Sequence, residues 1–537
     1  MSYPNPSQQP QQPPWQQLQP GQGFPTPQPA WGPGTPTGHP GGHVPPGGGG
    51  RGSGRNRWLI PVAAATAVAV MAGTVWASIS LVNFGGPQPE TVLPGNSVAF
   101  GKVDLSIDGN QAIELLSFLD QLPDEITDEM DDTDGEMNEL FADVFTEIYP
   151  DTRKSSVEEW IGDRVGGALW PTDNTNASED TGVAGAVALA VENERLAEEE
   201  FDSLSTDQEM DYEVVPGFVL ISYTGAALSD LHDQVDEHGT LEDAETFSAD
   251  MNSLPSGSLA STWTDYGAAL EVEELAQDFQ TDVGAEPVDL EGRLTASLRV
   301  DGDYLEVRSD LLELHVDGED MSWLSNTSNE AVDAIGQLPE SSVAAIGASG
   351  MDTALSEAYD NGSLDFVLDD RDFQMMESDL NSIGAHLPEG FGALLGSTTA
   401  YGITGMDGED FFQGTSEVPF EYRAVGGDEE VLNDFVSELV GDPFTQPPGV
   451  NSDGDDVVVT RGSAPTGVLG DDPVFQQTMQ EMDDSFVAGY VDLRQILEQD
   501  MDVDVPEQWG AFGVAVSVTE EGGRITGELR WAPSGGE

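Results

Sequence analysis

The sequence predicts an α+β protein with a duplicated unit of antiparallel sheet covered by helices, preceded by one transmembrane helix and a disordered N-terminal tail. Three observations predict this architecture. Apolar and polar residues alternate in several short segments, as in strands with one buried face. The same patterns recur later in the same order. An uncharged apolar stretch follows a tail of Pro, Gln and Gly, and the length of 537 residues suits two or three domains.

The tail, residues 1–57, contains no acidic residue and few apolar side chains. Such a composition cannot offset the entropy lost on ordering, so we predict a disordered cytoplasmic spacer. Its basic residues are Arg51, Arg55 and Arg57. An alternative is that its aromatic residues bind a proline-recognition domain. These are Trp15, Phe24 and Trp31.

Residues 58–82 are uncharged and rich in Ala, Val, Ile and Leu. Roughly 20 apolar residues suffice for a helix to cross a bilayer. The arginines lie on the amino-terminal side, which places residues 1–57 in the cytoplasm and the rest outside the cell. We therefore predict a single-pass protein of the cell membrane whose lipid partner contacts residues 58–82. A cleaved signal peptide is the alternative, and the long leader argues against it.

Small residues recur at every fourth position of this span, at Ala65, Ala69, Gly73 and Ala77. Such a stripe lets two helices approach closely, so a homodimer through these residues is the alternative to a stripe without a role. Ala-rich spans also form such stripes by chance.

After a linker over residues 83–92, two copies of one unit are predicted at 93–325 and 335–533. A proline-led strand near Leu93 recurs near Leu338, and a helix followed by a strand near Phe247 recurs near Phe475. Alternating segments from Leu294 and Phe512 each lead through a Gly-containing turn into a second alternating segment. These pairs predict β-hairpins.

Two segments carry a family resemblance. They are Leu93-Pro94-x-x-x-Val98-Ala99-x-x-x-Val103-Asp104 and Trp160-Ile161-Gly162-Asp163-Arg164-Val165-Gly166. Together with the tail and the span, they resemble a family of actinobacterial membrane-anchored envelope proteins, domain of unknown function 3352. The resemblance implies this topology and an envelope location, and it supplies no site residue to carry over, because the family has no assigned activity. From the residues alone, Gly162 to Gly167 predicts a turn into a strand over 168–170.

The chain has 100 Asp and Glu, 17 Lys and Arg and a net charge of −83. This charge argues against nucleic acid as a partner, because phosphates require a basic surface. Self-repulsion of this size predicts a salt-adapted protein. The absence of cysteine excludes disulfides, thiolate nucleophiles and cysteine-ligated metals.

The densest acidic run was compared with a calcium-binding loop. It contains Asp124, Glu125, Asp128, Glu129, Asp131, Asp132, Asp134, Glu136 and Glu139. Met130 and Phe141 occupy the first and last ligand positions, so the motif fails at both ends. A solvated loop is the prediction, and a loose divalent-cation site is the alternative.

No catalytic, cofactor-binding or metal-binding residue is predicted, because no known catalytic motif is present. Four histidines follow residue 58. His232 and His238 predict a polar surface helix or loop, with a zinc site as the alternative. His315 is predicted to lie in a strand and His386 in a turn.

The sequence therefore predicts a non-catalytic binding or structural ectodomain of the cell envelope, with an envelope protein or ligand as its partner. Three alternatives remain. The protein is a carrier of an apolar or lipid-like ligand, a hydrolase that uses carboxylates alone, or a relay of outside signals to the tail.

Overall fold

The structure is a computed structural model. It describes residues 87–104, 114–115, 117–119, 121–123, 126, 145–146, 149, 152–178, 182–207, 210–273, 275–276, 290–366, 370–405, 418–440, 448–462, 467–498, 503, 505–519 and 523–534. All of them belong to one unit, Gly52–Glu537.

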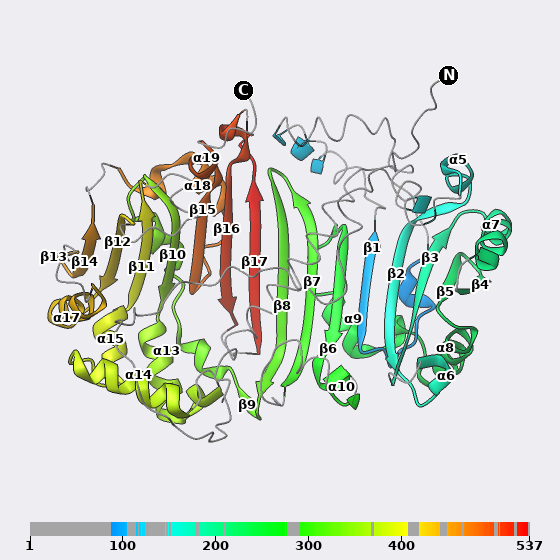
Figure 1. Cartoon of the computed structure of the whole chain (residues 1–537), viewed down its shortest axis with the longest axis horizontal. Helices are drawn as coiled ribbons and strands as arrows, with labels where there is room; N and C mark the ends of the chain where they lie inside the picture. The colour runs from blue at the N-terminus through cyan, green and yellow to red at the C-terminus, as the bar shows by residue number, and fades with distance from the viewer. Residues whose placement is uncertain are drawn as a thin grey trace, which may run out of the picture. The chain divides into compact units, whose positions relative to one another are not determined.

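The strands of this unit form one 17-stranded sheet in which every pairing is antiparallel (Figure 1). They are β1 (Ala99–Asp104), β2 (Ile161–Pro171), β3 (Val183–Val191), β4 (Asp211–Val215), β5 (Phe218–Ser222), β6 (Ala260–Asp265), β7 (Leu290–Asp301), β8 (Tyr304–Val316), β9 (Glu319–Asp320), β10 (Ser342–Ser349), β11 (Thr398–Thr404), β12 (Phe420–Val425), β13 (Gly449–Asp453), β14 (Asp456–Arg461), β15 (Val487–Asp492), β16 (Ala511–Val518) and β17 (Arg524–Ala532).

The described helices are short. They are α5 (Lys154–Val157), α6 (Thr175–Ser178), α7 (Glu194–Asp207), α8 (Gly225–His238), α9 (Glu245–Met251), α10 (Tyr266–Leu270), α12 (Ala331–Gly336), α13 (Met351–Asn361), α14 (Asp370–Ser382), α15 (Glu389–Leu395), α17 (Glu429–Val440), α18 (Pro473–Thr478) and α19 (Leu493–Leu497). The 3₁₀ turns are Pro89–Thr91, Leu241–Asp243, Ser322–Asn326, Ser363–Phe366, Leu469–Asp471 and Pro506–Trp509.

The sheet is built from two halves with the same order of strand pairing. Outward from the centre, one half runs β8, β7, β6, β1, β2, β3, β5, β4. The other runs β17, β16, β15, β10, β11, β12, β14, β13. The halves meet where β8 pairs with β17. We call this pairing the junction.

Local capping is also shared by the halves. Asp265 is the last residue of β6 and accepts a hydrogen bond from the Ala268 amide at the start of α10. Asp492 is the last residue of β15 and accepts one from the Gln495 amide at the start of α19. Aspartate favours such starts because its carboxylate accepts from an amide that has no partner within the helix.

Helices pack against both faces of the sheet toward its two ends. On one face, α8 and α9 cover Trp170 and Trp263 in the first half, and α12 and α18 cover Tyr490 in the second. On the other face, α7 packs over Leu189, and α17 packs over Ala424. Helices also reach the central strands, because α18 contacts β16 and β17, and α10 contacts β7.

The predicted fold class is wrong in two respects. The sheet is one large antiparallel sheet with helices on both faces, whereas helices were expected to cover one buried face of each unit. In the described part of the chain, no helix is long and apolar enough to cross a membrane. The span predicted over 58–82 lies outside the described residues. The predicted single-pass membrane location is withdrawn, because no described helix could cross a membrane.

Other predictions have separate outcomes. The two hairpins are present as β7 with β8 and as β16 with β17. The turn expected over Gly162 to Gly167 is wrong, because these residues lie inside β2. Predictions for the tail, the small-residue stripe at Ala65 to Ala77 and the acidic run from Asp124 lie outside the described residues. The boundaries 93–325 and 335–533 stay predictions.

Candidate functional site

One face of the sheet carries a row of apolar residues that crosses every strand except β9. Each residue is the direct cross-strand partner of the next. The row is Val450, Val459, Tyr422, Tyr401, Ile346, Gly489, Val514, Leu529, Val307, Leu298, Ala260, Val103, Val165, Leu189, Val219 and Val214. Direct partners lie on the same face, so these side chains share one surface.

The neighbouring row on that face is also uncharged across the same strands. It is Ser452, Val457, Ala424, Thr399, Ala348, Val487, Val516, Gly527, Ser309, Ala296, Thr262, Gly101, Gly167, Val187, Ile221 and Tyr212. We call the surface formed by these two rows the uncharged face. It belongs to a chain whose net charge is −83.

The opposite surface is charged at its centre, and we call it the charged face. Its central residues alternate with those of the uncharged face along β7, β8 and β17. They are Arg299, Glu306, Arg308, Asp310, Glu528 and Arg530. Charge is therefore segregated between the two sides of the sheet.

Parts of the uncharged face reach solvent. Ile346 is 55% exposed and Val514 is 40% exposed in the second half. Leu169, two positions along β2 from Gly167, and Val187 are 44% and 40% exposed in the first half. Between these places, the central residues of the face are buried in a small apolar cluster of Ala260, Ala296, Leu298 and Val307.

Gly489 separates Ile346 from Val514, because it pairs with Ile346 on one side and with Val514 on the other. A Cβ added at Gly489 would meet its nearest neighbours at 3.7 Å, an ordinary contact. The missing side chain therefore leaves a notch between two exposed apolar side chains, and we call it the Gly489 notch.

Ion pairs link the strands across the charged face. The Arg299 Nε lies 2.6 Å from Glu306 Oε1, and Arg530 Nη2 lies 3.4 Å from Glu306 Oε2. The same Arg530 nitrogen lies 3.3 Å from Glu528 Oε2. Burial first, and then the nearby Glu306 carboxylate, raise the pKa of Glu528. Burial also raises the pKa of Tyr304 to about 12, although Arg530 lies 4.4 Å from its ring centre and acts to lower it.

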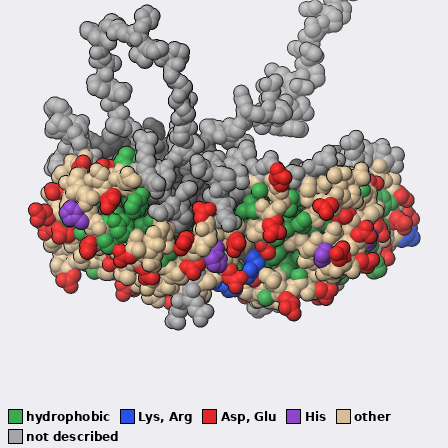
Figure 2. Space-filling view, turned by 90° about the horizontal axis from the view of Figure 1, so that it is seen from below, with side chains coloured by type: hydrophobic (Ala, Val, Ile, Leu, Met, Phe, Trp, Pro, Cys, Tyr) green, Lys and Arg blue, Asp and Glu red, His purple; other side chains and the backbone are tan. Residues whose placement is uncertain are grey.

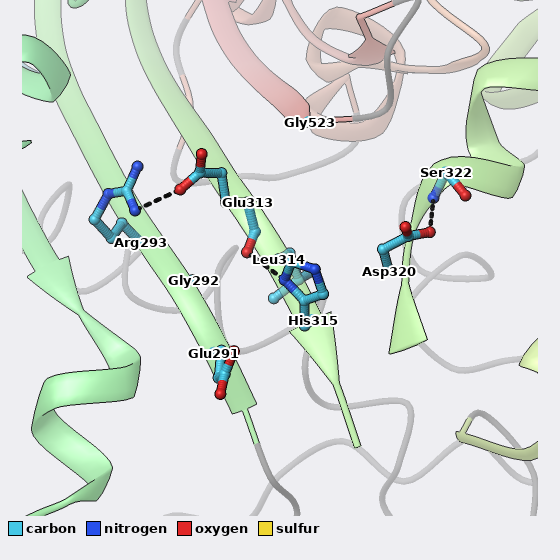
Figure 3. Close-up of a pocket in the computed structure, with 9 residues that line it drawn as sticks. All are labelled: Glu291, Gly292, Arg293, Glu313, Leu314, His315, Asp320, Ser322 and Gly523. Carbon is cyan, nitrogen blue, oxygen red and sulfur yellow. Dashed lines mark hydrogen bonds and ion pairs between the residues drawn. The ribbon is translucent and has the colours of Figure 1, made fainter. Parts of the chain in front are cut away.

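A pocket of about 330 Å³ lies where β7 and β8 shift register (Figure 3). Glu291 pairs with His315, whereas Arg293 pairs with Leu312, so Gly292 faces two residues of β8. Gly292 has a φ of 126°, and a Cβ there would lie 3.0 Å from the Leu312 carbonyl oxygen. Only glycine fits this close approach without strain.

Polar groups line this pocket. Arg293 donates to Glu313 at 2.8 Å, and the Ser322 amide donates to Asp320 at 3.0 Å. The hydrogen bonds from Ser322, and then the neighbouring His315, lower the pKa of Asp320. Asp320 is thereby held ionised and is poorly suited to donate a proton. The pocket suits polar binding better than acid catalysis by this residue.

The predicted histidines do not come together. His232 and His238 lie on α8, where His232 Nε2 is 2.8 Å from Glu213 on β4. His315 lies in β8, and His386 lies between α14 and α15. Within the described ranges, no group of three or more His, Asp or Glu side chains is arranged to hold a metal ion.

Figure 2 shows Asp and Glu spread over the surface seen from below, with few Lys and Arg.

The uncharged face was missed at the sequence level, although a signal for it exists. In β8, the charged residues Glu306, Arg308 and Asp310 stand at even positions, and the apolar residues Leu305 and Val307 stand at odd positions. Charged and uncharged residues alternate in the same way in β17. Each strand alone indicates one apolar face, but only the pairings show that the apolar sides of different strands line up.

The comparisons with known proteins give little similarity. No family model matches the sequence, and no curated protein is similar to it. A solved structure of TP0453, in crystal form I, is 8% identical with a TM-score of 0.22. The match covers 43% of this chain and 80% of that chain. Such a score does not establish a shared fold, and the resemblance to domain of unknown function 3352 stays a prediction.

Proposed function

We propose that the protein is a non-catalytic binding protein that takes an apolar, uncharged ligand on the uncharged face, such as the acyl chains of a neutral lipid. The observation that carries the proposal is the pair of exposed apolar side chains, Ile346 and Val514, which flank Gly489 on an uncharged surface of so acidic a chain. Of the functions that the sequence leaves open, the apolar carrier is the one this surface favours.

The exposed positions supply the binding energy in this proposal. Removing apolar surface from water yields roughly 25 cal/mol per Å², so covering Ile346 and Val514 favours association. Anionic ligands are repelled by the long-range field of the chain. A second copy of the chain brings the same negative charge, which disfavours self-association at low salt. A neutral apolar ligand meets neither penalty.

A hydrolase that uses carboxylates is less well supported. On the charged face, Glu306 is bound by Arg299 and Arg530, and in the pocket, Glu313 is bound by Arg293. A carboxylate pair for acid–base catalysis needs one member that is protonated and one that is free to act. These partners favour a structural role for the carboxylates.

The experiment uses the full chain, Nile red as a neutral apolar probe and vesicles of phosphatidylcholine as a neutral lipid. Ile346→Asp and Val514→Asp each place a charge beside the Gly489 notch. We expect each change to weaken probe binding roughly ten-fold, the effect of losing about 1.4 kcal/mol of apolar contact. Gly489→Ala adds only a Cβ, which would make ordinary contacts, and is expected to alter binding without adding charge.

Met375→Asp is the matched control. Met375 is an exposed apolar residue of α14, outside the uncharged face. This variant should bind the probe like the unmodified chain. Equal binding by all of these variants, or the absence of binding by the unmodified chain, would refute the proposal.

A further inference from the structure

The pocket at the register shift between β7 and β8 is built from both halves of the sheet (Figure 3). Strands β7, β8 and β9 and the turn Ser322–Asn326 line it on one side, and Gly523, just before β17, lines it on the other. The Glu313 amide donates to the Gly523 carbonyl oxygen at 2.9 Å, which holds the two sides together. The volume of about 330 Å³ far exceeds the roughly 30 Å³ of one water molecule in the liquid, so the pocket has room for a small organic molecule.

Negative charge dominates the lining of this pocket. Three carboxylates, those of Glu291, Glu313 and Asp320, line it together with one cation, Arg293. The guanidinium of Arg293 is already paired, because its Nε lies 2.7 Å from Asp250 Oδ2 and its Nη1 lies 2.8 Å from Glu313 Oε2. Arg293 is thus committed to Asp250 and Glu313, and the charges of Glu291 and Asp320 remain for a ligand.

The lining also presents hydrogen-bond acceptors. Asp320 accepts from the Ser322 amide at 3.0 Å, and because this donor is neutral, the carboxylate keeps its charge. His315 Nδ1 lies 3.0 Å from the Glu313 carbonyl oxygen, which can only accept, so Nδ1 carries the proton of this bond. In the neutral imidazole, Nε2 is then an acceptor. The pocket therefore offers carboxylate oxygens and an imidazole nitrogen to a ligand that donates hydrogen bonds.

This combination of charge and acceptors selects the ligand class. Glu291 and Asp320 repel an anion, and an apolar molecule would take their carboxylates out of water without giving them a partner. A metal ion is not favoured, because no three His, Asp or Glu side chains in the described part of the chain are arranged to hold one. We propose that the pocket binds a small organic cation with several N–H donors, a guanidinium or a primary ammonium compound. This site is independent of the function proposed for the uncharged face.

The first experiment compares three cations of equal charge by ligand-observed NMR titration of the full chain. They are propylguanidinium, propylammonium and tetramethylammonium, of which the last has no N–H group. In 0.15 M NaCl the Debye length is about 8 Å, which weakens attraction to the rest of the acidic surface. We expect tetramethylammonium to bind at least about five-fold more weakly than the better of the other two, because it cannot donate to the carboxylates. Equal affinity for the three cations would overturn the proposal.

Two variants then locate the binding site. Asp320→Asn removes a charge and keeps an oxygen that can accept from the Ser322 amide, and Glu291→Gln removes a charge at an exposed position. Each should weaken binding of the better cation about two- to five-fold, the range expected for an exposed ion pair. If Asp320→Asn does not fold, as judged by circular dichroism, Glu291→Gln decides the matter.

Glu319→Gln is the matched control. Glu319 precedes Asp320 in β9 and is also exposed, but it does not line the pocket. This variant changes the net charge of the chain by the same amount and should bind the cation like the unmodified chain. Affinity that is unchanged in the pocket variants, or reduced to the same extent in Glu319→Gln, would refute the site.

Discussion

Glu306 and Arg530 lie directly opposite each other across β8 and β17, with Arg530 Nη2 3.4 Å from Glu306 Oε2. Both side chains are almost completely buried. The next pair along the junction, Arg308 with Glu528, is also of opposite charge. A shift by two residues would place like charges opposite one another, so the pairs favour one register of the two halves.

Breaking this pair should strongly destabilise the protein. Arg530→Met leaves Glu306 with one arginine fewer in a buried setting, which typically costs about 3–5 kcal/mol. The double variant Arg530→Met with Glu306→Leu removes both charges and should be more stable than Arg530→Met alone. Denaturant unfolding of the three proteins measures the difference. A double variant no more stable than the single one would contradict a charge-based explanation.

The raised pKa of Glu528 predicts a specific pH dependence. Burial and Glu306 raise its folded-state pKa above the ordinary value of 4.5. Folding therefore favours the neutral form of Glu528. The stability that this form contributes is fully present below the unfolded-state pKa and is lost as the pH rises through the folded-state pKa. Glu528→Gln removes this loss. As the pH rises above the ordinary value of 4.5, the stability of Glu528→Gln should rise relative to the unmodified chain. Denaturant unfolding measures the free energy of unfolding of both proteins at each pH. If the two free energies change in parallel with pH, the effect is excluded.

Salt should stabilise the protein. With a net charge of −83, self-repulsion opposes compaction at low ionic strength. The Debye length falls from about 10 Å at 0.1 M to about 3 Å at 1 M, so most of this repulsion is screened at molar salt. We expect the melting temperature to increase with NaCl over this range. A melting temperature that stays constant would show that the acidic residues are tolerated without salt.

Trp160 should contribute substantially to stability. It is fully buried, and its ring centre lies 5.3 Å from that of Phe145 and 5.7 Å from that of Phe201. Trp160→Ala should cost about 3–5 kcal/mol, the range for large aromatic residues in cores. The exposed Met375→Ala should cost less than about 0.5 kcal/mol. Urea unfolding followed by circular dichroism compares them, and similar losses would contradict this assignment.

Local patterns predicted some elements of the fold well. Alternation from Leu294 and from Phe512 identified two hairpins, because a two-residue period and a glycine turn are properties of the local sequence. Gly162 and Gly166 misled the prediction toward a turn. In the structure, a Cβ at Gly166 would lie 2.6 Å from Pro89, so this glycine allows a close approach of the chain inside a strand.

The arrangement of the strands could not be predicted in the same way. The pairing of β8 with β17 joins residues more than two hundred positions apart, and no local signal specifies it. The Gly489 notch has the same origin, since Ile346 and Val514 become neighbours only through β15. The pocket at Gly292 depends on a register shift that no alternation pattern reveals.

At the junction, the border strand of each half, β8 or β17, pairs with the border strand of the other half. A break of the backbone within residues 327–330, after β9 and before α12, would yield two fragments, each with a long border strand whose amides and carbonyls lack their usual neighbours. The opposing charges on those borders would guide the fragments back into register. We therefore expect the two fragments to associate again through β8 and β17 when they are mixed.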